Sequence, residues 1–565
     1  MTDIIIGARR PPKRRAFRQV VLAGCALVFA GAIGVFVFRR AVAYEVPDTT
    51  VPDAPLRADP ARGSLAFAGA SLTRTGHLTV LHLSGTPAAI GVARGRLLGR
   101  RIDTASAALW PTIDHAISSG GLFGGLTHGA RLDWALRHIA RGIPGHQLVE
   151  IAGVVAGSEA TSEGAPSYRR LVRDAAAIDI GHPAPTADSF GRIARALTII
   201  AGPEKTGGRM LIGRTFGVPG ARGGGAALAA NPVVAFVHPD GVIPFVTVGW
   251  PALTGAVTGI NAEGIAVLIH PGVLEGVRPD RIAQPIPLLA RDILENARVL
   301  PDAIAILEHA HPLGAARFVI VDAKARTWAA IDRGPDQVAV AKDNPPAVVT
   351  GILAGAPFAE DPKNDRARRT SPAAARAARA AEILATTPPA VAADMAALLR
   401  DRRAAGGTPL SPGHRGAIAD PSAQHAIIFD ASAMVLYVSE GPGAAGRFFA
   451  FDLRYELSGR GARPAPPPPL ASAGPDALDE ATAQVTARGY LAAARAARAD
   501  DELGRARELC ARALAIAPGT PEVLLLATEL AREAGDGDRA QALAHRYLNS
   551  VPDDVLAADR LRGLY

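Results

Sequence analysis

The chain has 565 residues, and its 61 Lys and Arg against 53 Asp and Glu give a formal net charge of +8. This length allows two or three domains with a large core. The arginines are spread over several segments without an RNA- or DNA-binding motif, so we expect no nucleic-acid partner. The two cysteines lie far apart in the chain, and the histidines form no HExxH-type motif. We therefore expect no disulfide, no bound metal and no cofactor.

The first predicted element is an uncharged apolar run over residues 20–38. At about 1.5 Å per residue it is long enough to cross a hydrocarbon core of roughly 30 Å. Arginines and a lysine crowd residues 9–18, and only Arg39 and Arg40 follow the run. This asymmetry predicts a cytoplasmic N-terminus and an extracytoplasmic body. We favour an uncleaved signal anchor, although Ala41-Val42-Ala43 also fits a signal peptidase site.

A strand, a turn and a helix are predicted over residues 79–102, with Thr86 as N-cap and Pro87 at the first helical position. Gly91 and Gly95 lie four residues apart, which allows this helix to approach a neighbour closely. Helices are expected to continue to about residue 170. Apolar stretches at residues 171–179, 210–216 and 233–237 are then predicted as strands.

Residues 237–272 alternate apolar runs with turn sequences such as Pro239-Asp240-Gly241, which predicts successive strands. Hairpins are predicted at residues 317–332 and 425–439. Helices are predicted at residues 287–300, 372–387 and 391–402. Together these elements indicate stacked, mostly antiparallel sheets with helices.

Several short motifs occur in this part of the chain: GTPxxxGxxxG from Gly85, PDG, GWP and TGINAEG within residues 237–272, and LYVSEGP from Leu436. Together they resemble the acyl-coenzyme A:isopenicillin-N acyltransferase family, in the same order, over about residues 79–453. The resemblance implies an α+β, four-layer αββα sandwich of the N-terminal-nucleophile (Ntn) hydrolase type. It also implies self-cleavage and chemistry on the amide or acyl-thioester bond of a small molecule.

The family's nucleophile is a cysteine, and neither cysteine of this chain lies at the corresponding place. Alignment on Phe190 puts Ala187 there, whereas a shift of two residues makes Ser189 the nucleophile, released by cleavage after Asp188. A hydroxyl at a new N-terminus can attack a carbonyl with its own α-amine as base. An ordinary loop serine is the alternative interpretation of Ser189.

Two further residues match the family. Arg214 matches its Gly-Arg-Asn-x-Asp block, where Thr215 and Gly217 replace the Asn and the Asp. Asn261 matches a residue that the family uses as an oxyanion-side donor. Asparagine is also common at tight turns for conformational reasons alone, so a structural role for Asn261 stays open.

Two hypotheses follow. The first is an amide hydrolase or acyltransferase in which Ser189 is the nucleophile, Asn261 the oxyanion donor and Arg214 a residue that shapes the pocket. The second is a catalytically inactive family member that serves as a membrane-tethered scaffold for a ligand or protein, because several family residues are replaced.

The end of the chain is predicted to be a Pro-rich linker followed by helices. Pro518 and Pro552 close two similar helical segments 34 residues apart, which is the tetratricopeptide period. These helices are the expected site of a protein partner. The predicted divisions are a basic cytoplasmic segment (1–19), a membrane anchor (20–38), a linker (39–63), the Ntn-type domain (64–456), a second linker (457–480) and a helical domain (481–565).

Overall fold

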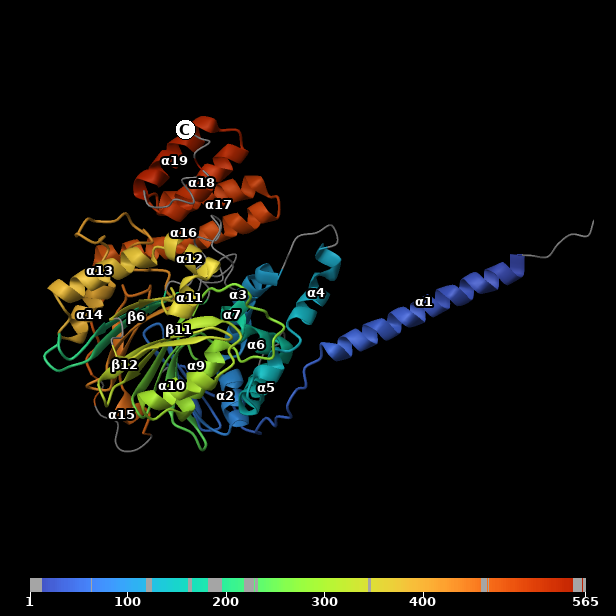
Figure 1. The fold of residues 1–565 in the computed structure, drawn as a ribbon, viewed down its shortest axis with the longest axis horizontal. Coiled ribbons are helices and arrows are strands. Elements are labelled where there is room, and N and C mark those ends of the chain that lie inside the picture. Colours follow the sequence, from blue (N-terminus) through green and yellow to red (C-terminus); the bar gives the residue numbers. More distant parts are fainter. Residues whose placement is uncertain are drawn as a thin grey trace, which may run out of the picture.

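The computed structural model describes residues 13–551 except 62, 118–123, 161–164, 181–195, 218–227, 229–231, 344–346, 459–464 and 466, and it also describes residue 561. Its body is built on two β-sheets, with helices on the outer face of each (Figure 1). A long helix extends away from this body, and a lobe of helices at the C-terminus lies on another side (Figure 1).

The larger sheet has eleven strands and the smaller sheet has six. In spatial order the larger sheet contains β1 (Arg57–Asp59), β2 (Ser64–Phe67), β3 (Ala70–Thr75), β4 (Leu78–Gly85), β7 (Val233–Pro239), β8 (Phe245–Gly249), β9 (Thr258–Asn261), β10 (Ile265–Gly272), β11 (Ala315–Asp322), β12 (Thr327–Arg333) and β13 (Val338–Ala341). The smaller sheet contains β14 (Val348–Thr350), β5 (Leu197–Ala201), β6 (Leu211–Phe216), β15 (His425–Asp430), β16 (Val435–Ser439) and β17 (Phe448–Asp452). Neighbouring strands are antiparallel except β4 and β7, which run parallel.

Helices cover both outer faces. The larger sheet packs against a group that comprises α2 (Pro87–Leu98), α3 (Arg100–Ile117), α5 (Gly145–Glu159), α6 (Tyr168–Asp174), α7 (Ala177–Ile180), α9 (Ile286–Asn296) and α10 (Leu300–His309). The smaller sheet packs against α13 (Ala373–Thr386) and α14 (Ala392–Leu399). Short helices connect these layers: α4 (Gly124–Ala135), η1 (Ile139–Gly142), α11 (Ala356–Ala359), α12 (Pro362–Thr370) and α15 (Leu453–Glu456).

Alternation of side chains along the strands produces three apolar layers. On β6, Ile212 faces the space between the sheets, while Leu211 faces the outer layer with α14. Gly213 also faces α14, since a Cβ there would lie 2.4 Å from the sulfur of Met395. The order is therefore helix, sheet, sheet, helix, which confirms the predicted four-layer αββα sandwich.

Close packing of α2 on α5 depends on glycines from both helices. A Cβ at Gly91 would lie 2.1 Å from the carbonyl oxygen of Glu150, and one at Gly95 would lie 2.4 Å from that of Val154. In return, a Cβ at Gly157 would lie 2.2 Å from the carbonyl oxygen of Val92. The predicted close approach at Gly91 and Gly95 is confirmed. The helix also begins as expected, because the Thr86 hydroxyl accepts a hydrogen bond from the Ala89 amide at 3.3 Å.

One predicted strand is wrong. Residues 171–179 fall in α6 and α7, whose apolar side chains pack against the helical layer of the larger sheet. A short apolar run has no period that separates a strand from a buried helix. The strand that precedes β6 is instead β5, which the sequence did not reveal. The hairpins at residues 317–332 and 425–439 are confirmed.

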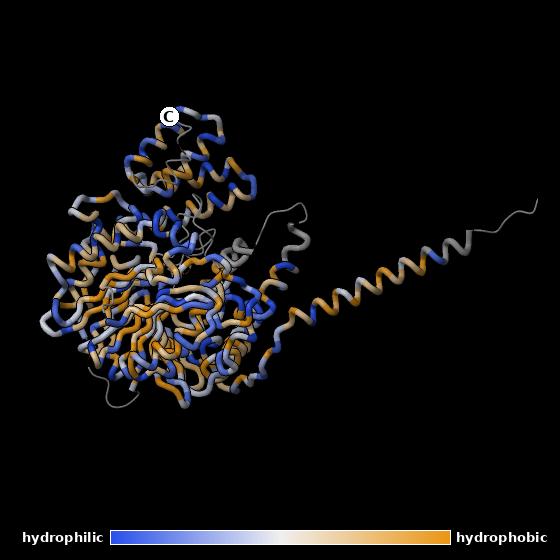
Figure 2. Tube along the Cα trace, in the orientation of Figure 1, coloured by the Kyte–Doolittle hydropathy of each residue, from blue (hydrophilic) through white to orange (hydrophobic). Residues whose placement is uncertain are grey.

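The N-terminal helix α1 (Lys13–Ala41) contains one stretch, Val21–Ala41, that is long and apolar enough to cross a membrane, with a mean hydropathy of 2.5. It is hydrophobic along most of its length and lies outside the body (Figure 2). Strand β1 begins inside the segment that was predicted as a linker.

At the other end, the helices α16 (Pro475–Ala499), α17 (Leu503–Ile516), α18 (Pro521–Glu533) and α19 (Gly537–Ser550) pack on one another in sequence. The chain before α16 is tied to the body. Leu470 exchanges backbone hydrogen bonds of 2.9 and 3.1 Å with Phe448, and the Ala473 amide donates to the Ala445 carbonyl at 2.8 Å. Part of the predicted second linker is thus packed against the smaller sheet.

Candidate functional site

A buried polar cluster lies between the two sheets, around Arg214. Its members are Thr198 on β5, Arg214 on β6, Thr258 on β9, His270 on β10 and His425 on β15, each at most 2% exposed. On each strand, the residue two positions away points into the same space between the sheets and is apolar. These residues are Ile200, Ile212, Ile260, Leu268 and Ile427. The strands thus bring five polar side chains together at one end of an otherwise apolar layer.

Arg214 uses every hydrogen of its guanidinium group inside the protein. An arginine has five N–H donors. Nε donates to the Thr258 hydroxyl at 2.9 Å, and Nη1 donates to the Thr198 hydroxyl and to His270 Nε2, both at 3.1 Å. Nη2 donates to the carbonyl oxygens of Val257 and Ile269. No N–H of this side chain is left for a substrate in this arrangement.

Both histidines contact hydroxyl groups in this cluster, and His270 also accepts a hydrogen bond from Arg214. Arg214 can only donate to His270 Nε2, so that nitrogen carries no proton. The Thr198 hydroxyl, which accepts from Arg214, lies 2.8 Å from the same nitrogen. The Thr258 hydroxyl likewise accepts from Arg214 and lies 2.8 Å from His425 Nε2. The cluster therefore contains two hydroxyl–imidazole pairs joined by one guanidinium.

Burial disfavours charge throughout the cluster. It lowers the pKa of Arg214 to about 9. Burial, followed by the nearby Arg214 cation, holds the pKa values of His270 and His425 well below the usual range, so both imidazoles are neutral. Arg291 in the helical layer is different, because it forms ion pairs with Glu150 and Glu295 at 2.6 and 2.7 Å. The described contacts of Arg214 are all with neutral groups.

These histidines predict how stability depends on pH. Their folded pKa values lie below the unfolded value of about 6.5, so the unfolded chain binds more protons below that pH and acid destabilises the fold. Relative to His425→Phe, the free energy of unfolding of the wild type should fall by up to about 1.4 kcal/mol per pH unit below pH 6.5. Urea unfolding of both proteins between pH 7.5 and about 5 measures this difference.

Other groups titrate equally in the two proteins and cancel. They include the buried carboxyls of Asp174 and Asp179, whose pKa values burial raises to about 7 and 8. A difference that does not change with pH would mean that His425 is charged in the fold.

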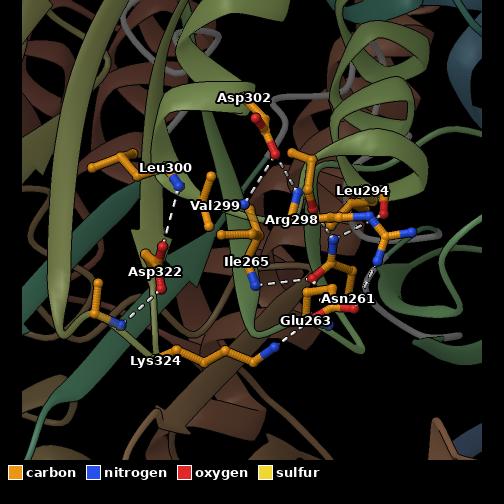
Figure 3. A network of polar contacts seen from close by, with 12 residues as sticks. Asn261, Glu263, Ile265, Leu294, Arg298, Val299, Leu300, Asp302, Asp322 and Lys324 are labelled. Carbon is orange, nitrogen blue, oxygen red and sulfur yellow. Dashed lines mark hydrogen bonds and ion pairs between the residues drawn. The ribbon is translucent and has the colours of Figure 1, made fainter.

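Asn261 faces away from the polar cluster. On β9, Thr258 and Ile260 point between the sheets, while Gly259 and Asn261 point to the helical layer at Leu294. Asn261 Nδ2 donates to the carbonyl oxygens of Leu294 and Ala297 at 3.0 and 2.8 Å, and Oδ1 accepts from the amides of Glu263 and Ile265 at 3.1 and 2.9 Å (Figure 3). This side chain joins the end of α9 to the β9–β10 turn.

We expect Asn261→Ala to lower the free energy of unfolding by about 2–4 kcal/mol, because it leaves buried backbone groups at both ends without partners. Asn296→Ala is a matched control on α9. Its exposed amide donates only to the Asp292 carbonyl in its own helix, so a change within about 0.5 kcal/mol is expected. Urea denaturation measures both variants. Equal effects would contradict the bridging role of Asn261.

The structure therefore places two of the three predicted site residues, and it does not bring them together. Ser189 lies outside the described residues. The segment that contains it leads into β5, the strand that carries Thr198. Sequence reasoning missed Thr198, Thr258, His270 and His425 as companions of Arg214. The available signal was a polar residue at an inward position of a strand that is otherwise apolar.

One described group has the side chains of a metal site. Ligand atoms of His146, Asp292 and Glu295 lie within 4.8 Å of one another. Glu295 instead contacts His146 Nε2 at 3.0 Å, and Asp292 accepts hydrogen bonds from the amides of Gln147 and Gln284. Burial raises the pKa of Asp292 to about 6. These ligand atoms pair with one another or with the two glutamine amides, so the group is a hydrogen-bonded cluster between α5 and α9.

Comparisons with known proteins give the family context. Residues 235–408 match the family model of acyl-coenzyme A:6-aminopenicillanic acid acyl-transferase, and residues 497–564 match a tetratricopeptide repeat. Among solved structures, one similar chain is a Caenorhabditis elegans N-acylethanolamine-hydrolyzing acid amidase ortholog, with 12% identity and a TM-score of 0.30, over 42% of this chain and 93% of that one. Another is a mutant conjugated bile acid hydrolase from Clostridium perfringens, with 9% identity and a TM-score of 0.28, over 43% and 88%. The search of curated proteins found no match.

Proposed function

Because this chain carries a segment of the acyl-coenzyme A:6-aminopenicillanic acid acyl-transferase family beside a tetratricopeptide repeat, we propose that it is a membrane-tethered, non-catalytic relative of these enzymes that acts as a protein-binding scaffold. In this proposal the sandwich is a rigid base, and the C-terminal helices recruit the protein partner.

One observation carries the proposal: the two described residues that match the family's site have structural tasks. All five N–H groups of Arg214 and both N–H groups of Asn261 are donated to atoms of the protein itself. An oxyanion donor must be aimed at the reacting oxygen before reaction. Recruiting either residue would break buried hydrogen bonds that hold strands and helices together.

The membrane anchor is supported by contacts just after α1. Val42 is 1% exposed, and its carbonyl oxygen accepts a hydrogen bond from Arg169 Nη2 at 2.8 Å. Cleavage after Ala43 would remove Val42 from the body. The fold thus favours retention of the apolar helix, with the body outside the membrane.

The C-terminal helices are held firmly on the body. Glu522 on α18 accepts hydrogen bonds from Arg415 of the body at 2.9 Å and from Arg488 on α16 at 3.2 Å. All three side chains are largely buried. A module fixed in this way presents its outer surface in one orientation, as a scaffold requires.

The second candidate is an autoproteolytic amide hydrolase or acyltransferase in which Ser189 is the nucleophile and the substrate is a small amide or acyl compound. One observation favours it. The segment with Ser189 enters the smaller sheet at Leu197, next to Thr198 of the polar cluster. Ser189 lies nine residues before Thr198 in the chain.

Intact mass and N-terminal sequencing of the full-length chain, purified in detergent and held for an extended incubation, test the two candidates. A single uncleaved chain is the expected result, both for the wild type and for Ser189→Ala. A second fragment that begins at Ser189, and that disappears in Ser189→Ala, would overturn the scaffold proposal and establish the enzyme.

A further inference from the structure

The chain that follows α1 is clamped to the body. The Tyr44 hydroxyl donates to the carbonyl oxygen of Leu136, and the guanidinium groups of Arg169 and Arg173 lie 5.6 and 5.8 Å from the centre of the Tyr44 ring. Asp133 of α4 forms ion pairs with both arginines, at 3.1 and 2.6 Å. Tyr44 is only three residues beyond Ala41, where α1 ends.

The clamp brings one exposed aromatic residue of the body to the end of α1. Trp134 on α4 is 49% exposed, and its ring stacks on Phe38 with centroids 6.3 Å apart and an interplanar angle of 19°. Phe38 is the last apolar residue before Arg39 and Arg40. Figure 1 shows α4 beside the point where α1 leaves the body. If α1 spans a bilayer, Trp134 lies at the depth where the hydrocarbon core meets the headgroups.

The surroundings of Trp134 fit that depth. The Arg137 guanidinium lies 4.2 Å from the centre of the Trp134 ring, and Arg131 and Arg141 are exposed nearby in the chain. Arg39 and Arg40 follow Phe38 directly, so basic residues flank both stacked rings in the chain, and Asp280 lies 3.8 Å from Arg137. Tryptophan favours the membrane–water interface, and basic residues are attracted to an anionic bilayer surface.

We propose that the face of α4 formed by Trp134, Arg131 and Arg137 is a membrane-docking surface for anionic lipid. The body then rests on the bilayer in one orientation, and it does not swing on a free linker. This inference depends on the proposed membrane span of α1 and adds a second contact of the body itself.

The test is tryptophan fluorescence of the full-length chain in vesicles of phosphatidylcholine and phosphatidylglycerol whose acyl chains are brominated near the glycerol. Bromine quenches only nearby indoles. We expect Trp134→Phe to at least halve the quenched fraction. Trp328→Phe, which removes a tryptophan that packs against the core between the sheets, should leave it unchanged. Arg131→Glu should lower quenching in these vesicles.

Equal quenching of the wild type and Trp134→Phe would overturn the docking surface. Quenching that Arg131→Glu does not change would overturn the role of charge. Alkaline extraction of the same vesicles separates this failure from failure of the anchor. A chain that stays in the membrane without quenching of Trp134 lacks only the docking contact, whereas a chain released by alkali lacks the span as well.

Discussion

Gly157→Ala should lower the free energy of unfolding by about 3 kcal/mol or more, although alanine is normally the better helix residue by about 1 kcal/mol. The new Cβ would lie 2.2 Å from the Val92 carbonyl oxygen and 3.0 Å from the Arg96 amide nitrogen. Both atoms belong to the backbone of α2, so no side chain can turn aside to relieve the contact. The helices must separate, and buried apolar contacts between α2 and α5 are lost.

Gly489→Ala is the matched control, because it makes the same change in the exposed interior of α16. A Cβ at Gly489 meets nothing within 4 Å, so helix propensity alone predicts a gain of up to about 1 kcal/mol. Thermal or urea unfolding of the two variants measures both effects. If Gly157→Ala also stabilised the protein, the close approach of α2 and α5 would be contradicted.

Local patterns predicted most strands and helices and the stacked antiparallel sheets, whereas the four-layer order came from the family resemblance. Apolar runs in residues 317–332 and 425–439, with polar turns between them, led to the right hairpins. The helix predicted at residues 372–387 corresponds to α13. Residues 171–179 failed because a short apolar run satisfies both a strand and a buried helix. Strand β5 was missed because it has only five residues. Both of its faces are buried, so its sequence shows no alternation of apolar and polar residues.

The candidate site was predictable only in part, for a different reason. Arg214 and Asn261 were identified by resemblance, and resemblance says nothing about which hydrogen bonds a side chain already makes. The direction in which Asn261 points depends on which face of β9 the helix α9 covers. The companions of Arg214 come from four strands between residues 198 and 425. Only the pairing of the two sheets brings them together.

Glu522→Ala should cost about 3–5 kcal/mol in the docking of the C-terminal helices, since it leaves buried guanidinium groups without this carboxylate. Arg415 and Arg488 both donate to Glu522, and Glu522 is 8% exposed at its side chain. The expected result is a separate, earlier unfolding transition of α16–α19 and faster proteolysis between residues 458 and 480. Calorimetry and limited proteolysis of the full-length chain measure these changes.

Glu480→Ala provides the matched control at the same junction. Its carboxylate pairs with Arg402 of the body, but Arg402 is exposed and Glu480 is partly exposed, so removal should change stability by no more than about 1 kcal/mol. If both variants behaved alike, the buried ion pairs would not hold the module, and the C-terminal helices would move independently of the sandwich. A difference of several kcal/mol would mean that the sandwich fixes the direction of the tetratricopeptide surface. The sandwich would then have a structural role, the orientation of this surface, that requires no catalysis.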